Sequence, residues 1–200
     1  MTRPATPRPA APRIVALGGT VNPGSSTEQA LRLAAGIAGG EGAEVQVFGG
    51  EYLTALPHYL GPLHDVSQGA EMVAAVREAD GLLIAAPGYH GTISGLVKNA
   101  LDYLEDLARD ERPYLDGRAV GLIATAFGDQ ASMSTLLTMR AITHALRGWP
   151  TPMGATIRTY RGLFSPDGEC LDERARGQLE LVGRQVVLGA RSFAAGRDLA

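Results

Sequence analysis

The chain has 200 residues, enough for one domain with a substantial hydrophobic core. Hydrophobic residues make up 45% of it and charged residues 20%, a balance typical of soluble globular proteins. The formal net charge of −3 gives no electrostatic reason to expect binding to nucleic acid or to an anionic membrane. Cys170 is the only cysteine, which excludes an intrachain disulfide and CxxC motifs, so no metal site is expected.

The N-terminal residues 1–12, MTRPATPRPAAP, combine arginines and prolines without an apolar segment. We therefore predict a disordered tail over 1–12, followed by one domain over 13–195. The tail lacks the apolar region of a signal peptide, and no run of about 18 apolar residues predicts a membrane span. A cytoplasmic protein is expected.

The rest of the chain alternates between two kinds of pattern. Short apolar or alternating runs predict strands, and apolar residues at helical spacing predict helices. Strands are expected at 13–19, 43–50, 81–87, 118–126 and 152–158. Helices are expected at 26–39, 67–79, 94–108, 130–147 and 172–195, with a long loop at 51–66. This alternation predicts a three-layer α/β domain with a parallel sheet, whose ligands bind beyond the carboxyl ends of the strands.

The loop after the first predicted strand, GGTVNPGSSTEQAL (18–31), is rich in hydroxyl groups. Thr20, Ser25, Ser26 and Thr27 precede or begin a helix, whose N-terminal amides favour a phosphate. The loop is neither a GxxxxGK[ST] P-loop nor a GxGxxG motif. Ser25 and Glu28 also match a capping box, which alone would leave the other hydroxyls unexplained. The pattern favours phosphate binding, and capping can occur together with it.

The third predicted strand leads into PGYHGTISGLVKNALDYLEDL (87–107). Gly88 and Gly91 bracket Tyr89 and His90 and permit backbone conformations closed to larger residues. Tyr89 offers a flat face or a hydroxyl, and His90 offers a donor. The alternative for His90 is a loop histidine that bonds only to backbone and solvent.

The helix that follows this loop carries Lys98, the only lysine, which is expected to be solvated. Asn99 is a candidate to form hydrogen bonds back to a loop. An apolar face is expected to pack on the sheet and is broad enough to meet a partner subunit. Its members are Leu101, Tyr103, Leu104 and Leu107.

The segment PGYHGTISGLVKNALDYL closely resembles the second loop of the NAD(P)H-dependent FMN reductases of the flavodoxin-like superfamily, which carry a PEYNGSIPGxLKNALDW-like motif. The first loop is similar to that family's GSxRxxSxN pattern, and the resemblance runs from about residue 13 to 190. It implies a flavodoxin-like three-layer α/β/α sandwich with a five-stranded parallel sheet in the order 2-1-3-4-5. It also implies FMN as cofactor and NADPH or NADH as electron donor.

The resemblance implies three groups of cofactor-binding residues. Those expected near the phosphate are Thr20, Asn22, Ser25, Ser26 and Thr27. Those expected along the isoalloxazine ring are Pro87, Gly88, Tyr89, His90 and Gly91, with Thr125, Ala126, Phe127 and Gly128 closing its other side.

Three positions depart from the family pattern. Asn22 replaces an arginine, Gly88 a glutamate and His90 an asparagine. The first change predicts weaker or exchangeable FMN binding, unless another arginine takes the place of the missing one. The other two alter the edge of the flavin pocket, and His90 is the one candidate for a direct catalytic role in the choice of acceptor.

The implied activity is hydride transfer from NAD(P)H through FMN to an acceptor, with the flavin supplying the chemistry. The acceptor is free flavin, which could supply a partner monooxygenase, or a small molecule such as a quinone, azo dye or nitro compound. A homodimer, with a tetramer as a further option, is also implied. No basic cluster dedicated to a nicotinamide 2′-phosphate is evident, and Arg140 and Arg147 are candidates for such a site. The alternatives are a flavodoxin-type electron carrier and an interaction domain without flavin.

Overall fold

The computed structural model describes residues 11–61 and 67–197. Its strands are β1 (Arg13–Gly18), β2 (Glu44–Phe48), β3 (Gly81–Tyr89), β4 (Thr92–Ile93), β5 (Ala119–Ala126) and β6 (Trp149–Arg158). Five of them form a parallel sheet in the order β2-β1-β3-β5-β6, as predicted for five strands. The sheet differs from the prediction by β4, a short strand antiparallel to the end of β3.

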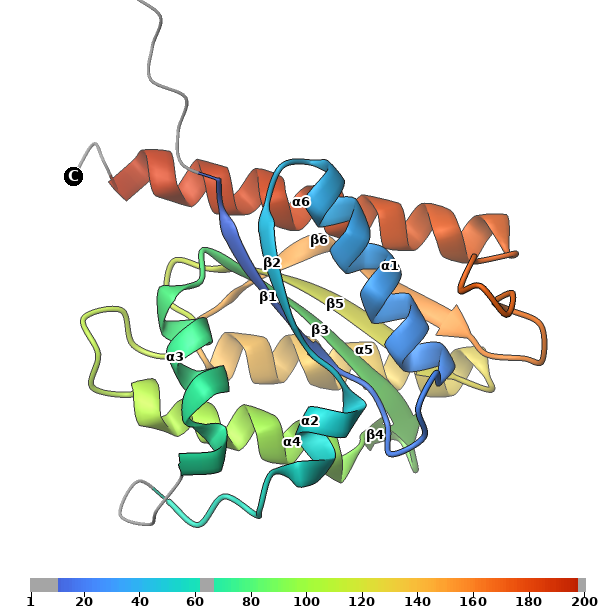
Figure 1. The fold of residues 1–200 in the computed structure, drawn as a ribbon, viewed down its shortest axis with the longest axis horizontal. Helices are drawn as coiled ribbons and strands as arrows, with labels where there is room; N and C mark the ends of the chain where they lie inside the picture. Colours follow the sequence, from blue (N-terminus) through green and yellow to red (C-terminus); the bar gives the residue numbers. More distant parts are fainter. Residues whose placement is uncertain (1–10, 62–66, 198–200) are drawn as a thin grey trace, which may run out of the picture.

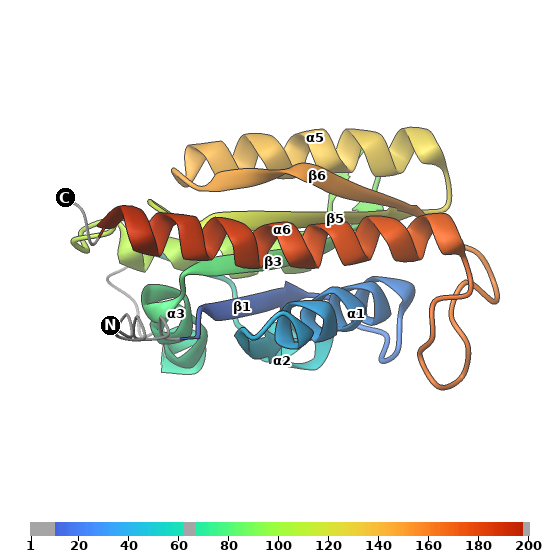
Figure 2. The same cartoon turned by 90° about the horizontal axis from the view of Figure 1, so that it is seen from above.

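Helices cover both faces of this sheet (Figure 1). They are α1 (Ser26–Gly40), α2 (Gly50–Ala55), α3 (Ala70–Glu78), α4 (Gly95–Asp102), α5 (Asp129–Ala145) and α6 (Glu173–Arg197). Helices α1 and α6 pack side by side on one face, and α3, α4 and α5 lie on the other. Helix α6 runs along most of the length of the molecule (Figure 2). The predicted three-layer α/β class is therefore confirmed.

The central strands are apolar throughout because helices cover them on both sides. Every residue of β5 is buried, and β3 is buried from Gly81 to Pro87. Alternate residues enter opposite cores: Leu82 and Ile84 face α3 and α4, whereas Leu83 and Ala85 face α1 and α6. Each fully buried Leu or Ile side chain contributes about 1.5–3 kcal/mol of transfer free energy.

The structure corrects several predicted boundaries. The long loop expected at 51–66 contains α2, which is too short to show a helical period in the sequence and is anchored by the buried Leu53. Residues 62–66 of that loop lie outside the described residues. The helix expected at 94–108 ends at Asp102 and continues as a 3₁₀ turn over Tyr103–Leu107.

Two strands are longer than predicted. β6 begins at Trp149 instead of residue 152, and it accommodates Pro150 and Pro152 because it is an edge strand. β3 continues past Pro87 to Tyr89 because its last residues pair with β4.

The helix after the second loop packs within its own chain. The predicted bonds of Asn99 are confirmed: its Oδ1 accepts from the Tyr59 amide at 2.9 Å and its Nδ2 donates to the Pro57 carbonyl at 2.9 Å. Leu101, Tyr103, Leu104 and Leu107 are buried in the core, as expected for a packing face. The prediction that this face meets a partner subunit is wrong for these side chains, because α2, α3 and the sheet cover them.

Other expectations concern the ends and the cysteine. Residues 1–10 of the predicted tail lie outside the described residues. Among the helices that the structure describes, none combines the length and apolar character needed to cross a bilayer.

Cys170 is buried, its Sγ lies 3.5 Å from the Asp172 carbonyl oxygen, and burial raises the pKa of its thiol. A buried thiol with a raised pKa is a poor nucleophile.

Candidate active site

The loops after β1, β3, β5 and β6 meet at the carboxyl edge of the sheet and enclose a cavity of about 370 Å³. Of the residues expected at a flavin site, eleven line it: Thr20, Asn22, Ser25, Ser26, Thr27, Pro87, Gly88, Tyr89, Thr125, Ala126 and Phe127. His90, Gly91 and Gly128 are not among its lining residues. The volume is within the usual range for small-molecule sites.

The first loop brings hydroxyl groups to the start of α1. The Ser25 side chain accepts a hydrogen bond from the Glu28 amide at 3.3 Å and so caps the helix, as predicted. The other half of a capping box is missing, because the Glu28 carboxylate pairs with Arg32 at 2.7 Å. The Thr20 hydroxyl accepts from the Asn22 amide at 3.1 Å and holds the turn that precedes the helix.

A buried pair of hydroxyls connects the first and third loops. The Thr27 and Thr125 side-chain oxygens lie 2.6 Å apart, and both residues are buried. Thr27 lies in the first turn of α1, whereas Thr125 lies near the end of β5. This contact places the start of α1 directly above the carboxyl ends of the central strands.

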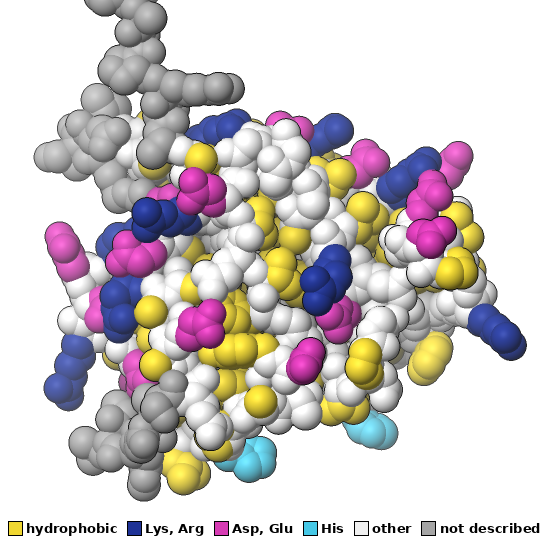
Figure 3. Space-filling model, in the orientation of Figure 1, with side chains coloured by type: hydrophobic (Ala, Val, Ile, Leu, Met, Phe, Trp, Pro, Cys, Tyr) yellow, Lys and Arg dark blue, Asp and Glu magenta, His cyan; other side chains and the backbone are white. Residues whose placement is uncertain are grey.

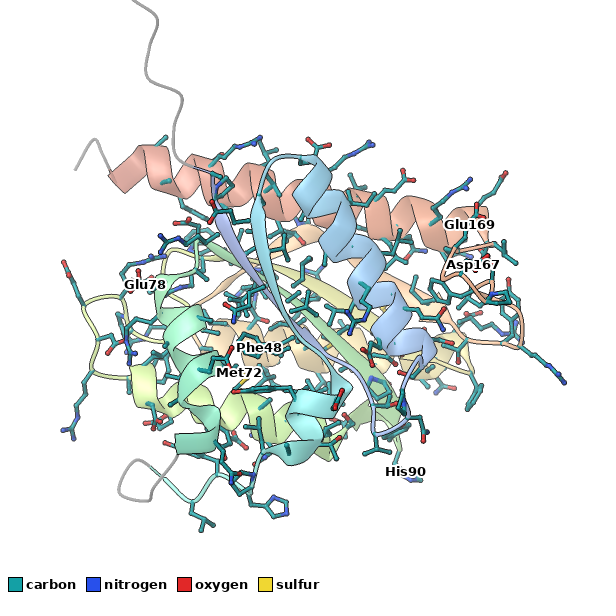
Figure 4. The ribbon with its side chains drawn as sticks, viewed as in Figure 1. Phe48, Met72, Glu78, His90, Asp167 and Glu169 are labelled. Atoms are coloured by element: carbon teal, nitrogen blue, oxygen red, sulfur yellow. The ribbon has the colours of Figure 1, made fainter. Side chains whose placement is uncertain are left out.

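The second loop is a tight hairpin between β3 and β4. His90 and Gly91, between the two strands, have φ values of 51° and 88°. Positive φ at two consecutive residues is the geometry of a type I′ hairpin turn. His90 is exposed at the edge of the molecule, at the tip of this hairpin (Figure 4). Tyr89, one residue earlier, lines the cavity and is 49% exposed.

Gly88, in the second loop, packs closely against α5. A Cβ atom at this position would lie 2.5 Å from the Thr135 hydroxyl and 3.2 Å from the Ala131 carbonyl oxygen. Thr135 is fully buried. The glycine that stands in place of the family's glutamate is therefore required by packing in this chain.

Replacing Gly88 by alanine is expected to lower the free energy of unfolding by about 1–3 kcal/mol, because the new methyl overlaps the Thr135 side chain. Thr135→Ala removes the overlapping hydroxyl, so the double variant should lose less stability than the sum of the single variants. The loss in the double variant should be about 1 kcal/mol smaller than the summed losses of the single variants, because the two residues are in contact. Urea unfolding measures the free energies. Additive losses would contradict the proposed overlap.

A fourth segment of the cavity wall follows β6 and was not predicted; it consists of Thr159, Tyr160 and Arg161. Its position in the chain could have indicated it, because the segment follows a predicted parallel strand, and ligands bind beyond the carboxyl ends of such strands. The Tyr160 hydroxyl donates to the Asp172 carboxylate at 3.2 Å.

The pKa values of Tyr160 and Asp172 are both shifted. Loss of hydration raises the pKa of Tyr160, and its bond to Asp172 adds to the increase. The backbone bond from Ala175, at 2.8 Å, lowers the pKa of Asp172, which caps α6. Tyr160 is therefore a neutral donor near pH 7 and Asp172 an anion.

The arginines proposed for a 2′-phosphate site lie elsewhere. Arg140 donates to the Pro152 carbonyl at 2.9 Å, and the Arg147 guanidinium lies 5.5 Å from the centre of the Tyr114 ring. Neither residue lines the cavity. In the described part of the chain, no group of three or more His, Cys, Asp or Glu residues is arranged to hold a metal.

Other hollows in the surface have different characters. A groove of about 510 Å³ shares Tyr160 with the cavity and is lined by Arg158 and Arg174, beside the edge strand β6. A third hollow, between β2 and α3, is lined partly by Val45, Ala74 and Ala75. Figure 3 shows hydrophobic side chains gathered in the centre of one face, with charges of both signs around them. The groove includes the Thr156 hydroxyl, Tyr160 and the start of α5, but neither hollow includes the hydroxyl-rich start of α1 or the rings of Tyr89 and Phe127.

The groups lining the 370 Å³ cavity suit an elongated ligand with two unlike ends. Hydroxyls and the first amides of α1 are groups that bind a phosphate. Tyr89 and Phe127, which is 84% exposed, offer faces for a flat ring. A flavin mononucleotide has both features, so the residues present fit this cofactor.

Comparison with curated proteins gives relatives of moderate similarity. An NADPH azoreductase from Bacillus sp. (strain OY1-2) is 30% identical over 116 residues, which cover 57% of this chain and 60% of the relative. An FMN-dependent NADPH-azoreductase from Staphylococcus haemolyticus (strain JCSC1435) is 36% identical over 118 residues, covering 59% and 54%. The match thus spans a little over half the length of these curated relatives.

Solved structures share the fold at low sequence identity. FerB, a flavoenzyme NAD(P)H:(acceptor) oxidoreductase from Paracoccus denitrificans, superposes with a TM-score of 0.73 at 17% identity over 92% of this chain and 99% of FerB. A flavodoxin, WrbA-like protein from Agrobacterium tumefaciens gives 0.62 at 16% identity, covering 92% and 99%. These likenesses confirm the flavodoxin-like arrangement of the sheet and helices.

A family model specifies the relationship further. The model described as NADPH-dependent FMN reductase matches residues 12–160, which include β1 to β6 and the four loops around the cavity, up to Tyr160. The chain therefore belongs to the NADPH-dependent FMN reductase family.

Proposed function

We propose that this protein is an NADPH-dependent oxidoreductase that binds FMN in the cavity at the carboxyl edge of the sheet. One observation carries the proposal: the cavity joins the hydroxyl-rich start of α1 to the exposed aromatic rings of Tyr89 and Phe127. The names of the relatives, which include NADPH azoreductases, support NADPH as electron donor. The function is assigned to the single domain expected over residues 13–195.

The side chains of the first loop bind the phosphate end of the cofactor in this proposal. Ser25 accepts from a helix amide, and its own hydroxyl hydrogen bonds to no described residue, so it can donate to a phosphate oxygen. Ser26 lines the same wall and adds a second hydroxyl. The free amides at the start of α1 add positive electrostatic character.

The second and third loops orient the ring. When bound, FMN supplies the capacity to accept a hydride from the nicotinamide and pass it to an acceptor. Pro87, Tyr89, Ala126 and Phe127 line the cavity and exclude water from the covered part of the ring. His90 does not line the cavity, but it is exposed at the tip of the hairpin that carries Tyr89, which supports a proposed role in contact with an arriving acceptor.

The acceptor is proposed to be a small organic molecule or free flavin. Phe127 lines the cavity and is 84% exposed, so its ring is accessible to a second ligand that approaches from solvent. The relatives named as azoreductases favour azo compounds within this class, with quinones and nitro compounds as chemically similar acceptors. Supply of reduced flavin to a partner monooxygenase is the corresponding role if free flavin is the acceptor.

A homodimer in the cytoplasm completes the proposal. Met133 and Leu137 are 49% and 60% exposed and lie one turn apart on α5, the helix that begins beside the cavity. An exposed apolar stripe on one helix favours contact with a second subunit. This surface of α5 replaces the buried face of Leu101, Tyr103, Leu104 and Leu107 as the proposed contact between subunits.

A charge placed at the phosphate end tests the function. Ser26→Glu is expected to weaken FMN binding at least about tenfold, because the carboxylate repels the phosphate, and to change riboflavin binding much less. Ser192→Glu, on an exposed part of α6, is the matched control. Binding is followed by the quenching of flavin fluorescence.

The unaltered protein gives the direct result. With FMN it should show flavin absorbance near ~450 nm that NADPH bleaches in the absence of oxygen and an acceptor restores. A protein that takes up no FMN is not a flavoenzyme. A protein that binds FMN but is not reduced by NADPH would be an electron carrier instead.

A further inference from the structure

We propose that Arg161 supplies the positive charge that binds the phosphate group of FMN in this protein. The inference rests on the proposed function and adds a residue from outside the three loops that the sequence predicted. Arg161 stands in the fourth segment of the cavity wall, after β6.

Arg161 differs in charge from the rest of the cavity wall. Arg161 is the only charged residue among those that line the cavity within the described chain; the other lining side chains are neutral. A phosphate carries close to two negative charges at neutral pH, and hydroxyls and amides alone do not neutralise them. A guanidinium contributes hydrogen bonds of roughly twice the strength of neutral ones, in a planar arrangement that matches phosphate oxygens.

The bonding state of its side chain also distinguishes Arg161. Arg161 is exposed and forms no hydrogen bond or ion pair with any other residue that the structure describes. By contrast, Arg32 pairs with Glu28, and Arg140 bonds to a backbone carbonyl. The Arg161 guanidinium is therefore available to a ligand without breaking a contact inside the protein.

The backbone is anchored on both sides of Arg161. The Thr159 amide donates to the Ala126 carbonyl at 2.7 Å, which fixes the start of this segment to the end of β5. The Leu163 amide donates to the Tyr160 carbonyl at 3.2 Å, and the Leu163 side chain is buried. Arg161 thus lies in a turn held on both sides, with only its long side chain free to move.

The first loop lacks a cation of its own, because a neutral residue, Asn22, stands where the family pattern has an arginine. Asn22 lines the same cavity and is neutral, so the first loop contributes no charge to the phosphate. The required cation then comes from the other end of the sheet. Because Arg161 is exposed, its attraction for phosphate should weaken as salt concentration rises.

The test compares two ligands that differ by the phosphate alone. Arg161→Gln is expected to raise the dissociation constant of FMN about 10- to 100-fold and that of riboflavin less than about threefold. Arg158→Gln is the matched control, because Arg158 is an arginine of the neighbouring groove and does not line this cavity. Affinities are measured by fluorescence quenching at two salt concentrations, with circular dichroism to verify folding.

A second variant tests the charge by restoring it elsewhere. Adding Asn22→Arg to Arg161→Gln returns a guanidinium to the same cavity and should recover most of the lost FMN affinity. The inference is overturned if Arg161→Gln leaves FMN binding unchanged, weakens FMN and riboflavin equally, or affects FMN no more than Arg158→Gln does. If the unaltered protein binds neither flavin, the proposed function fails and this inference fails with it.

Discussion

Replacing Arg118 by leucine is expected to lower the free energy of unfolding by about 3–5 kcal/mol, one of the two largest effects among the substitutions considered. The side chain is 1% exposed, and its guanidinium bonds to backbone carbonyl groups at 2.7–3.3 Å. These belong to Arg77, Ala79, Tyr114 and Asp116. Leucine is apolar and shorter than arginine, so it leaves the carbonyl groups without this donor.

The contribution of Arg118 is structural, since the residue joins the end of α3 to the loop before β5. Urea unfolding measures the loss, and Arg118→Lys should give an intermediate value because an ammonium cannot reach all the carbonyl groups. Arg184→Leu removes an exposed arginine that pairs with Glu41 at 3.3 Å, and it should change stability by less than about 1 kcal/mol. Similar losses for Arg118→Leu and Arg184→Leu would show that the buried bonds contribute little.

Replacing Gly18 by alanine is expected to cost about 3–5 kcal/mol and to weaken FMN binding as well. Gly18 has a φ of 147°, and a Cβ there would lie 2.1 Å from the Ala85 carbonyl oxygen. The clash involves the backbone of β3, which no side-chain rotation relieves. To accommodate the methyl group, β1 must separate from β3 where the first loop begins, and the cavity wall moves with it.

Gly36→Ala is the matched control for this substitution. Gly36 is exposed on α1, and a Cβ there would meet nothing within 4 Å. Alanine in a helix is favoured over glycine by up to about 1 kcal/mol, so this variant should be slightly more stable and bind FMN normally. The same chemical change thus has opposite signs at Gly18 and Gly36. Equal effects at the two positions would contradict the argument from close packing.

Much of the fold follows from hydrophobic pattern, because the central strands are buried on both faces. The run GLLIAAP predicts a strand since nothing polar interrupts it, and the structure places it at the centre of the sheet. Helix α2 escapes prediction because six residues cannot show a helical period. β6 begins before the predicted residue 152, because an edge strand can contain prolines that would break the hydrogen bonding of a central strand.

The sequence predicts a site residue correctly where its side-chain type and its place beside a helix or strand are sufficient to define its role. Ser25 precedes a helix, and its capping role follows from the sequence alone. The role proposed for Arg161 does not, since it depends on the segment after β6 lining the same cavity as the start of α1. The need for glycine at position 88 likewise depends on the approach of α5, a contact between segments 47 residues apart in the chain that no local pattern records.

The hydroxyl pair of Thr27 and Thr125 has a consequence for the energetics of ligand capture. The bond joins the loop proposed to bind the phosphate to the loop proposed to line the ring, and it forms as the chain folds. The entropy lost in aligning these two walls is therefore part of the cost of folding and not of association. A ligand that contacts both walls binds to a preorganised site. Contacts at its two ends should therefore both increase affinity without a further entropic cost for aligning the walls.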